Sequence, residues 1–215
     1  MLDGFVAAGR STLELDSAVE AFIRNDLNAR PASLGQYDYP FSINTSINEV
    51  VCHGMPSAKD VLKDGDIVNI DITLEKGGFI ADSSKMYMIG TVAPKARRLV
   101  DMTFEAMWAG IRQVKPGARL GDIGHAIQSH AQANGYSVVR EYGGHGIGRE
   151  MHEEPQILHF GRPATGLTLR EGMVFTIEPM LNQGSAKVRS LKDGWTVVTR
   201  DNSLSAQWEH TVAVT

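Results

Sequence analysis

The 215-residue chain is poor in cysteine and has no long apolar run. Its single cysteine, Cys52, excludes an internal disulfide. A membrane helix needs about 18 consecutive apolar residues, and no segment approaches that length. The first residues also lack the basic and apolar regions of a signal peptide. These absences predict a protein of the reducing cytoplasm that has no membrane partner.

Positive charge is not in excess either. The formal net charge is −4 and the pI is about 6.0, with lysines and arginines scattered along the chain. This pattern excludes the basic surface that a nucleic-acid partner would require. Hydrophobic residues make up 42% of the chain, which is enough for a sizeable core. Because no linker or low-complexity stretch interrupts the sequence, we expect residues 1–215 to form a single domain.

Periodic patterns predict both helices and strands. A capping box at Ser11–Glu14 starts the first helix, Pro94 starts the second, and Gly135 caps the end of the third. The predicted helices span 12–29, 94–115 and 120–134, and the later strands span 137–141, 173–177, 195–199 and 210–214. This mixture is typical of an α+β fold.

A β-hairpin is predicted around two aspartates. Alternating polarity over 68–74 places Asp71 on the polar face of a strand, and a glycine-rich turn should return the chain as a second strand that contains Asp82. A loop of Lys76 and Gly77 would set the two aspartates directly opposite each other, whereas a loop shifted by one residue would make them diagonal neighbours. Adjacent carboxylates repel each other, and a bound cation removes that conflict. The alternative is that one aspartate points to solvent.

Other titratable side chains lie at strand ends or in tight loops. His145 is surrounded by glycines that let backbone and substrate approach it closely, but their spacing is not that of a phosphate loop. Glu178 ends an apolar run, and Glu209 precedes another. His152 has no second histidine four residues later, which excludes a zincin motif. Taken singly, each of these residues is more often structural than functional.

Taken together, seven segments resemble the methionine aminopeptidases in order and spacing. These segments are 48–54, 69–71, 82–85, 144–148, 152–155, 176–179 and 209–211. The resemblance extends from about Gly9 to Thr215, and the short stretch between Glu178 and Glu209 leaves no room for the helical insert of type II, so the chain resembles type I. It implies the pita-bread (creatinase/aminopeptidase) fold with two halves related by pseudo-twofold symmetry. It also implies that residues 1–215 form one metallo-aminopeptidase catalytic domain.

The resemblance implies a two-metal site. Asp71, Asp82, His145, Glu178 and Glu209 would be the ligands of two divalent ions, with Asp82 and Glu209 bridging. Four carboxylates and one imidazole suit Mn, Fe or Co better than a metal selected by thiolates. Two such ions can activate water and polarise a peptide carbonyl. The partner would be the N-terminus of a peptide or nascent protein, bound by a monomer.

Catalytic roles follow from the same resemblance. Glu178 would be the proton shuttle, His152 would donate to the carbonyl oxygen, and His53 would lie near the departing group. The alternative for both histidines is an ordinary loop histidine with satisfied hydrogen bonds.

The substrate pocket departs from the family pattern. The residues expected to contact substrate are His53, Tyr39, Gln36, Met151, His152 and Trp195. Tyr39 and Trp195 match the family, whereas Gln36 replaces an aromatic residue and Met151 replaces a phenylalanine. Ser33 and Asn44 also stand where bacterial enzymes often carry cysteine, so the pocket is more polar than usual. Three functions therefore stay open: a methionine aminopeptidase, an aminopeptidase of altered or weak N-terminal specificity, and a non-catalytic pita-bread binding module.

The start of the chain also differs from the family. Type I enzymes usually carry another helix ahead of the first helix predicted here, which begins close to Met1. That helix would cover apolar surface, so its absence predicts lower stability or a partner on that face.

Overall fold

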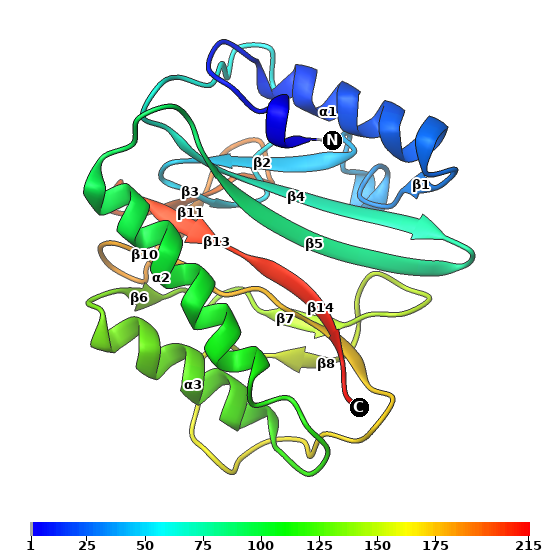
Figure 1. Cartoon of the computed structure of the whole chain (residues 1–215), viewed down its shortest axis with the longest axis vertical. Helices are drawn as coiled ribbons and strands as arrows, with labels where there is room; N and C mark the ends of the chain where they lie inside the picture. Colours follow the sequence, from blue (N-terminus) through cyan, green and yellow to red (C-terminus); the bar gives the residue numbers. More distant parts are fainter. Residues whose placement is uncertain (1) are drawn as a thin grey trace.

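A long antiparallel sheet crosses the middle of the molecule (Figure 1). The computed structural model describes residues 2–215, and within them this sheet has the strand order β1-β4-β5-β14-β9-β7-β8, with β2 paired to β4. Its strands are β1 (Arg30–Pro31), β2 (Ile43–Ile47), β4 (Ile67–Lys76), β5 (Phe79–Met88), β7 (Gly144–Gly146), β8 (Glu153–Ile157), β9 (Val174–Ile177) and β14 (Glu209–Ala213). The sheet therefore joins strands from both halves of the chain.

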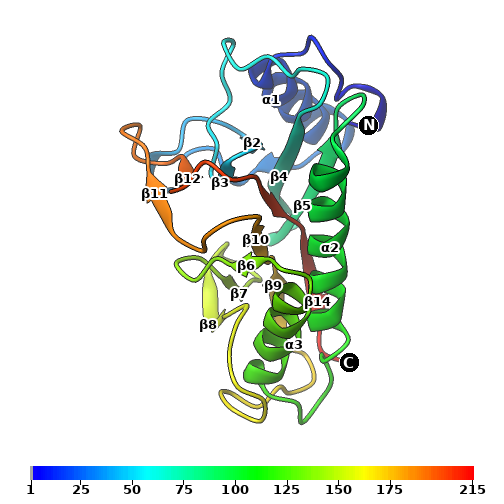
Figure 2. The same ribbon diagram turned by 90° about the vertical axis from the view of Figure 1, so that its left-hand side faces the viewer.

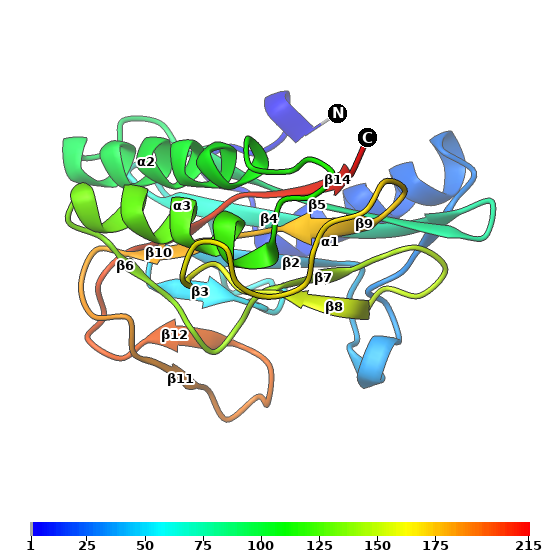
Figure 3. The same cartoon turned by 90° about the horizontal axis from the view of Figure 1, so that it is seen from below.

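Two smaller sheets connect distant segments. One contains β6 (Ser137–Val138), β10 (Met180–Asn182) and β13 (Ser205–Gln207), and the other contains β3 (Val50–Cys52), β11 (Val188–Ser190) and β12 (Val197–Thr199). Figures 2 and 3 show the hairpin β11–β12 on the side of the large sheet opposite the helices. The face of the large sheet opposite the helices is therefore lined by short strands and loops.

Helices cover the other face of the large sheet (Figures 2 and 3). The helices are α1 (Thr12–Ala21), α2 (Pro94–Ile111) and α3 (Leu120–Ala133), and short helical turns lie at Leu2–Gly4, Phe22–Asp26 and Gln36–Asp38. One core forms between α1 and strands β2 and β4, and a larger one forms beneath α2 and α3. Burial of apolar side chains in these two cores packs the helices against the sheet.

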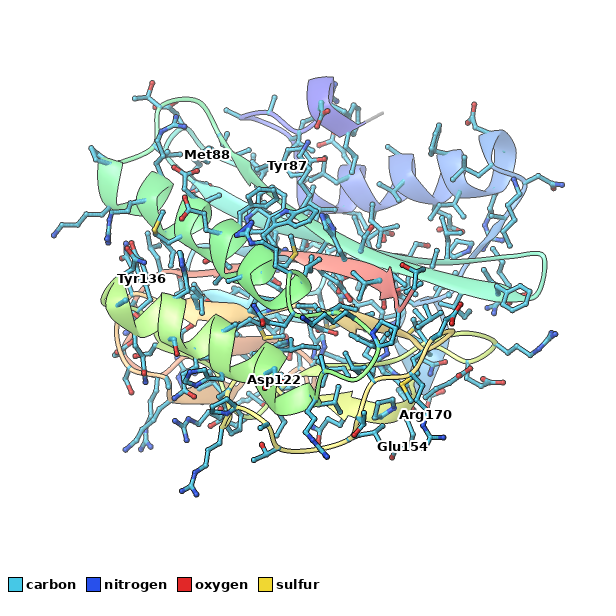
Figure 4. All side chains as sticks on the ribbon, turned by 60° about the horizontal axis from the view of Figure 1, so that its bottom comes forward. Tyr87, Met88, Asp122, Tyr136, Glu154 and Arg170 are labelled. Atoms are coloured by element: carbon cyan, nitrogen blue, oxygen red, sulfur yellow. The ribbon has the colours of Figure 1, made fainter. Side chains whose placement is uncertain are left out.

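Local sequence signals explain the helix ends. The capping box is present, because the Ser11 hydroxyl accepts a hydrogen bond from the Glu14 backbone N–H and the Glu14 carboxylate accepts one from the Ser11 N–H. Figure 4 labels Asp122, near the start of α3, and Tyr136, just beyond its end. The Arg98 guanidinium of α2 lies 5.4 Å from the Tyr136 ring centroid and links the two helices.

The first helix is shorter than predicted. Instead of continuing to residue 29, α1 ends at Ala21 and is followed by a π-helical turn over Phe22–Asp26. Asn28 then takes a positive φ of 47°, which turns the chain into β1. The second helix and the third end close to where the prolines and Gly135 predict, and Gly135 has a φ of 82°. The strand predicted at 137–141 is likewise shorter and ends at Val138.

The hairpin takes the shifted register. Gly77 and Gly78 form its turn with φ of 63° and 79°, and Lys76 pairs with Phe79. Asp71 therefore lies opposite Ser84, and Asp82 lies opposite Thr73. Direct pairing of the two aspartates is wrong, and the diagonal alternative is correct. The physical reason is that a two-residue hairpin turn favours glycines where positive φ is required.

Among residues 2–215, none of the helices is long and apolar enough to cross a membrane.

Candidate metal centre

The structure brings together the five side chains that the sequence singles out. They are Asp71 on β4, Asp82 on β5, His145 on β7, Glu178 directly after β9, and Glu209 at the start of β14. All five line one cavity of about 370 Å³. Because these strands are neighbours in the same sheet, their backbone hydrogen bonds hold residues from distant parts of the sequence at one place.

The ligand atoms are close enough to share a cation. Atoms of Asp82, His145 and Glu209 lie within 4.8 Å of one another. The His145 Nε2 atom is 3.6 Å from Glu178 Oε1 and 3.9 Å from Asp82 Oδ2. Asp71 joins the group diagonally across the hairpin from Asp82.

The imidazole of His145 presents an unprotonated nitrogen to the carboxylates. Its Nδ1 atom lies 3.0 Å from the backbone oxygen of Gly146, and because a carbonyl oxygen can only accept, Nδ1 carries the proton. Burial lowers the pKa of His145 to about 4, which keeps the ring neutral. Nε2 is therefore available as a metal ligand.

Hydrogen bonds to the carboxylates are incomplete. Asn44 Nδ2 donates to Asp71 Oδ2 over 3.1 Å, and Thr73 Oγ1 donates to Asp82 Oδ1 over 2.8 Å. The other oxygen of Asp71, Oδ1, is buried without a hydrogen-bond partner among residues 2–215. A buried carboxylate oxygen without a donor is costly, and a cation would satisfy it.

Burial and mutual repulsion disfavour full ionisation of this group. Burial raises the pKa of Asp71 to about 6 and that of Glu178 to about 8. It also raises the pKa of Asp82 and of Glu209, and the neighbouring carboxylates raise both further. Such a cluster of buried oxygens beside one neutral imidazole fits divalent cations, which would offset the repulsion.

Two more histidines line the same cavity. The His152 ring meets the His145 ring edge to face, with centroids 4.4 Å apart. The exposed Tyr37 ring also stacks on His152, with centroids 6.0 Å apart. His53 has a positive φ of 55° and meets the Tyr142 ring edge-on at 5.5 Å. Burial lowers the pKa of both His53 and His152, which favours the neutral form of both rings.

The predicted pocket residues also border this cavity. Those that line it are Ser33, Gln36, Tyr39, Asn44, Met151 and Trp195. The Tyr39 and Trp195 rings meet edge to face with centroids 4.9 Å apart, and the Tyr39 hydroxyl donates to the Ile43 carbonyl over 3.0 Å. The Asn44 amide, expected to make the pocket polar, instead donates to Asp71.

Comparison with known proteins gives the family. The model of metallopeptidase family M24 matches residues 1–215. The methionine aminopeptidase of Escherichia coli (strain K12) is 53% identical over 215 residues, which cover all of this chain and 81% of that protein. The methionine aminopeptidase of Rickettsia prowazekii is 56% identical over 206 residues, which cover 95% of this chain and 79% of that protein.

The chain belongs to metallopeptidase family M24.

Solved structures support the same family and its fold. The crystal structure of methionine aminopeptidase from Rickettsia prowazekii has a TM-score of 0.97 and 54% identity, and the match covers all of this chain and 86% of that one. The prolidase from Pyrococcus furiosus, at 23% identity, has a TM-score of 0.74 over 99% of this chain and 55% of that one, and shows the fold alone. This M24 chain therefore has the α+β pita-bread fold that the sequence predicts.

Sequence reasoning missed two residues that support the site in this M24 metallopeptidase, His159 and Gln207, and assigned no role to Thr176, which lies in the segment 176–179. His159 is fully buried, and its Nε2 accepts a hydrogen bond from the Glu178 backbone N–H over 3.1 Å. Thr176 and Gln207 donate to the Glu178 carboxylate. His159 and Gln207 lie outside the seven segments, because their importance comes from the Glu178 backbone and carboxylate that the fold places opposite them.

Proposed function

We propose that this chain is a methionine aminopeptidase, a divalent-metal-dependent hydrolase that removes the N-terminal methionine from peptides and nascent proteins. The observation that carries this proposal is the convergence of four carboxylates and one neutral imidazole in a single cavity that also contains His53 and His152. The 53% identity with the Escherichia coli methionine aminopeptidase supports the same activity.

Two divalent ions would be held by Asp71, Asp82, His145, Glu178 and Glu209, which line one cavity. The donor set supports Mn, Fe or Co. The unpartnered Asp71 Oδ1 and the raised pKa of the four carboxyl groups support the need for positive charge at this point. When bound, the ions would activate water and polarise the scissile carbonyl.

The remaining roles follow from side-chain chemistry. Glu178 would take a proton from the attacking water and return it to the departing amine, because its carboxylate lies inside the cavity beside His145. A ring N–H of His152, which lines the cavity, would stabilise the developing charge on the carbonyl oxygen. His53 would lie beside the departing group. The free amine of the substrate would bind near Asp71, which restricts cleavage to the first residue.

The aromatic wall formed by Tyr39 and Trp195 would hold the side chain of the first residue. Met151 adds a flexible thioether surface suited to another unbranched apolar side chain. Binding of methionine would then rest on apolar and sulfur–aromatic contacts rather than on ionic pairing.

A second candidate is an aminopeptidase of altered N-terminal specificity. It is favoured by Ser33 and Gln36, two polar residues that line the cavity together with the aromatic wall. A polar lining gains less from an apolar side chain and more from one that can form hydrogen bonds.

We also propose that residues 1–215 act as one catalytic domain and as a monomer. The cavity is lined from Ser33 to Glu209 by a single chain, so a second copy is not needed to complete it. A reducing cytoplasm suits the free, buried Cys52. Light scattering coupled to size-exclusion chromatography tests the oligomeric state.

The activity is tested with peptides that differ only in their first residue. The protein is loaded with Mn or Co, release of the first residue is measured, and Glu178→Ala is the control. Metal-dependent release of methionine that the control lacks is the expected result. Release of a different residue would support the second candidate, and absence of release despite stoichiometric metal binding would contradict both.

A further inference from the structure

Thr176 makes two hydrogen bonds that join two of the proposed metal ligands. It lies on β9, is fully buried, and precedes Glu178 by two residues. Its hydroxyl donates to Glu178 Oε1 over 2.7 Å. The Thr176 Oγ1 atom also accepts a hydrogen bond from the His145 backbone N–H over 3.0 Å. One small side chain therefore bridges strand β7 and the carboxylate that follows β9.

The direction of these bonds is determined by chemistry. A hydroxyl has one proton to donate, and the backbone N–H of His145 can only donate. The Thr176 oxygen must therefore accept from His145, and its own proton points at Glu178 Oε1. When Glu178 is ionised its carboxylate can only accept, so the Thr176 hydroxyl then donates to Oε1 and sets its orientation.

The second oxygen of Glu178 is also held. Gln207 Nε2 donates to Oε2 over 3.3 Å, and the backbone oxygen of Gln207 accepts a hydrogen bond from Asn69 Nδ2 over 2.8 Å. Gln207 and Asn69 are both almost fully buried. Each oxygen of the Glu178 carboxylate thus accepts a hydrogen bond from a side chain. In Asp71, only Oδ2 accepts a side-chain hydrogen bond within residues 2–215, from Asn44.

Close approach of the backbones allows Thr176 to span the gap. A Cβ atom placed on Gly144 would lie 2.3 Å from the Thr176 carbonyl oxygen and 3.0 Å from its Oγ1. A residue with a side chain at 144 would push the two strands apart. Glycine next to His145 therefore brings β7 near enough for the hydroxyl to reach both ligands.

We propose that Thr176 is a positioning residue of the metal centre, which sets the orientation of the Glu178 carboxylate and ties it to the backbone of His145. This proposal rests on the proposed function, since it takes both residues as metal ligands. A hydrogen-bonded partner of this kind stabilises a ligand in its binding orientation before the metal arrives.

The test compares variants that separate the hydroxyl from the shape of the side chain. Thr176→Val keeps the volume and removes the hydroxyl, and Thr176→Ser keeps the hydroxyl. Thr103→Val is the matched control, because Thr103 is fully buried in α2 and its hydroxyl donates to the Leu99 carbonyl, away from the cavity. Binding of Mn²⁺ to the metal-free proteins is measured by isothermal titration calorimetry, and kcat and KM are measured at saturating Mn²⁺.

The expected result is that Thr176→Val weakens Mn²⁺ binding by about 10- to 100-fold. Thr176→Ser should restore most of the affinity, and Thr103→Val should bind Mn²⁺ as the wild type does. At saturating Mn²⁺, kcat should fall in Thr176→Val while KM changes little, because Thr176 is not among the described residues that line the cavity. A role in general stability alone would lower the melting temperature of both valine variants without separating their Mn²⁺ affinities.

Wild-type Mn²⁺ affinity in Thr176→Val would overturn the proposal, and so would a wild-type protein that binds no Mn²⁺. If valine prevents folding, Thr176→Ala is measured with the same expectation. Failure of the proposed function is distinguishable: a wild type that binds Mn²⁺ but releases no methionine contradicts the aminopeptidase activity, whereas the order of Mn²⁺ affinities still decides the role of Thr176.

Discussion

The candidate metal centre and the candidate substrate pocket line one cavity but are built differently. The five candidate ligands lie on or directly beside strands of the large sheet, where ladder hydrogen bonds fix their positions. The pocket wall comes largely from irregular segments, including the turn that holds Gln36 and the loops that hold Met151 and Trp195. Rigid strands suit chemistry that needs fixed distances, while loops can change residue and shape without disturbing it.

The backbone of the two regions shows the same contrast. Tyr37 and Asp38, in the turn beside the pocket, have positive φ values of 49° and 66°. Such conformations are uncommon for residues other than glycine and are tolerated where surrounding contacts support them. The strand residues Asp71 and Asp82 instead sit in regular antiparallel register. Changes in the metal centre should therefore affect catalysis, and changes in the pocket should affect selectivity.

The largest expected effect comes from Glu178→Gln. The variant keeps the shape but cannot take up a proton, so kcat for a methionyl peptide should fall by about 10² to 10⁴-fold. Initial rates of peptide hydrolysis at saturating metal measure kcat. If Glu178→Gln retained wild-type kcat, the proton-shuttle role would be wrong and the contrast between the two regions would lose its main support.

Metal removal should expose the cost of the clustered carboxylates. In the metal-free protein, the pKa of Glu178 is raised from its usual value of 4.5 to about 8. Between these values the folded state holds a proton that the unfolded chain has released, so the free energy of unfolding falls as pH rises from 4.5 to about 8. The expected loss is on the order of 2 kcal/mol, because coupled neighbours share the shift.

Thermal unfolding in EDTA across this pH range measures the loss. Glu178→Gln should flatten the pH dependence, and added Mn²⁺ should raise the melting temperature most at the high end of the range. If the free energy of unfolding of the metal-free protein did not change with pH, the raised pKa of Glu178 would be contradicted.

The pocket variant with the largest expected effect is Trp195→Ala. Loss of half of the aromatic wall should lower kcat/KM for methionyl peptides by about 10- to 100-fold, since roughly 1 to 3 kcal/mol of apolar contact is removed. Mn²⁺ affinity, measured by calorimetry, should stay unchanged. An equal loss of Mn²⁺ affinity would show that pocket and metal centre are not separable.

The smallest expected effect is a gain in Gln36→Phe. An aromatic side chain at the rim should improve kcat/KM for methionyl peptides by a factor of about 2 to 5, because the lining becomes less polar. Competition between methionyl and glutaminyl peptides in one reaction measures the selectivity. An unchanged ratio would show that Gln36 does not contact the first residue.

Much of the site could be predicted from the sequence. The segments around Asp71, His145 and Glu178 resemble those of the methionine aminopeptidases in order and spacing, and that resemblance implied a shared metal centre. The structure brings these residues into one cavity. The hairpin register could not be decided, because a shift of one residue in the turn depends on which glycine takes positive φ. The early end of α1 at Ala21 was also not predictable from a pattern that continues to look helical.

The sequence by itself determined the classes of element and, through its resemblance to the methionine aminopeptidases, the residues of the candidate metal centre. Only the tertiary structure decided that the Asn44 amide turns to Asp71, that His159 accepts from the Glu178 backbone, and that the Thr176 hydroxyl joins His145 to Glu178. The physical reason is that element type and metal preference follow from local patterns and side-chain chemistry. The direction of a buried hydrogen bond depends instead on which group the fold places opposite.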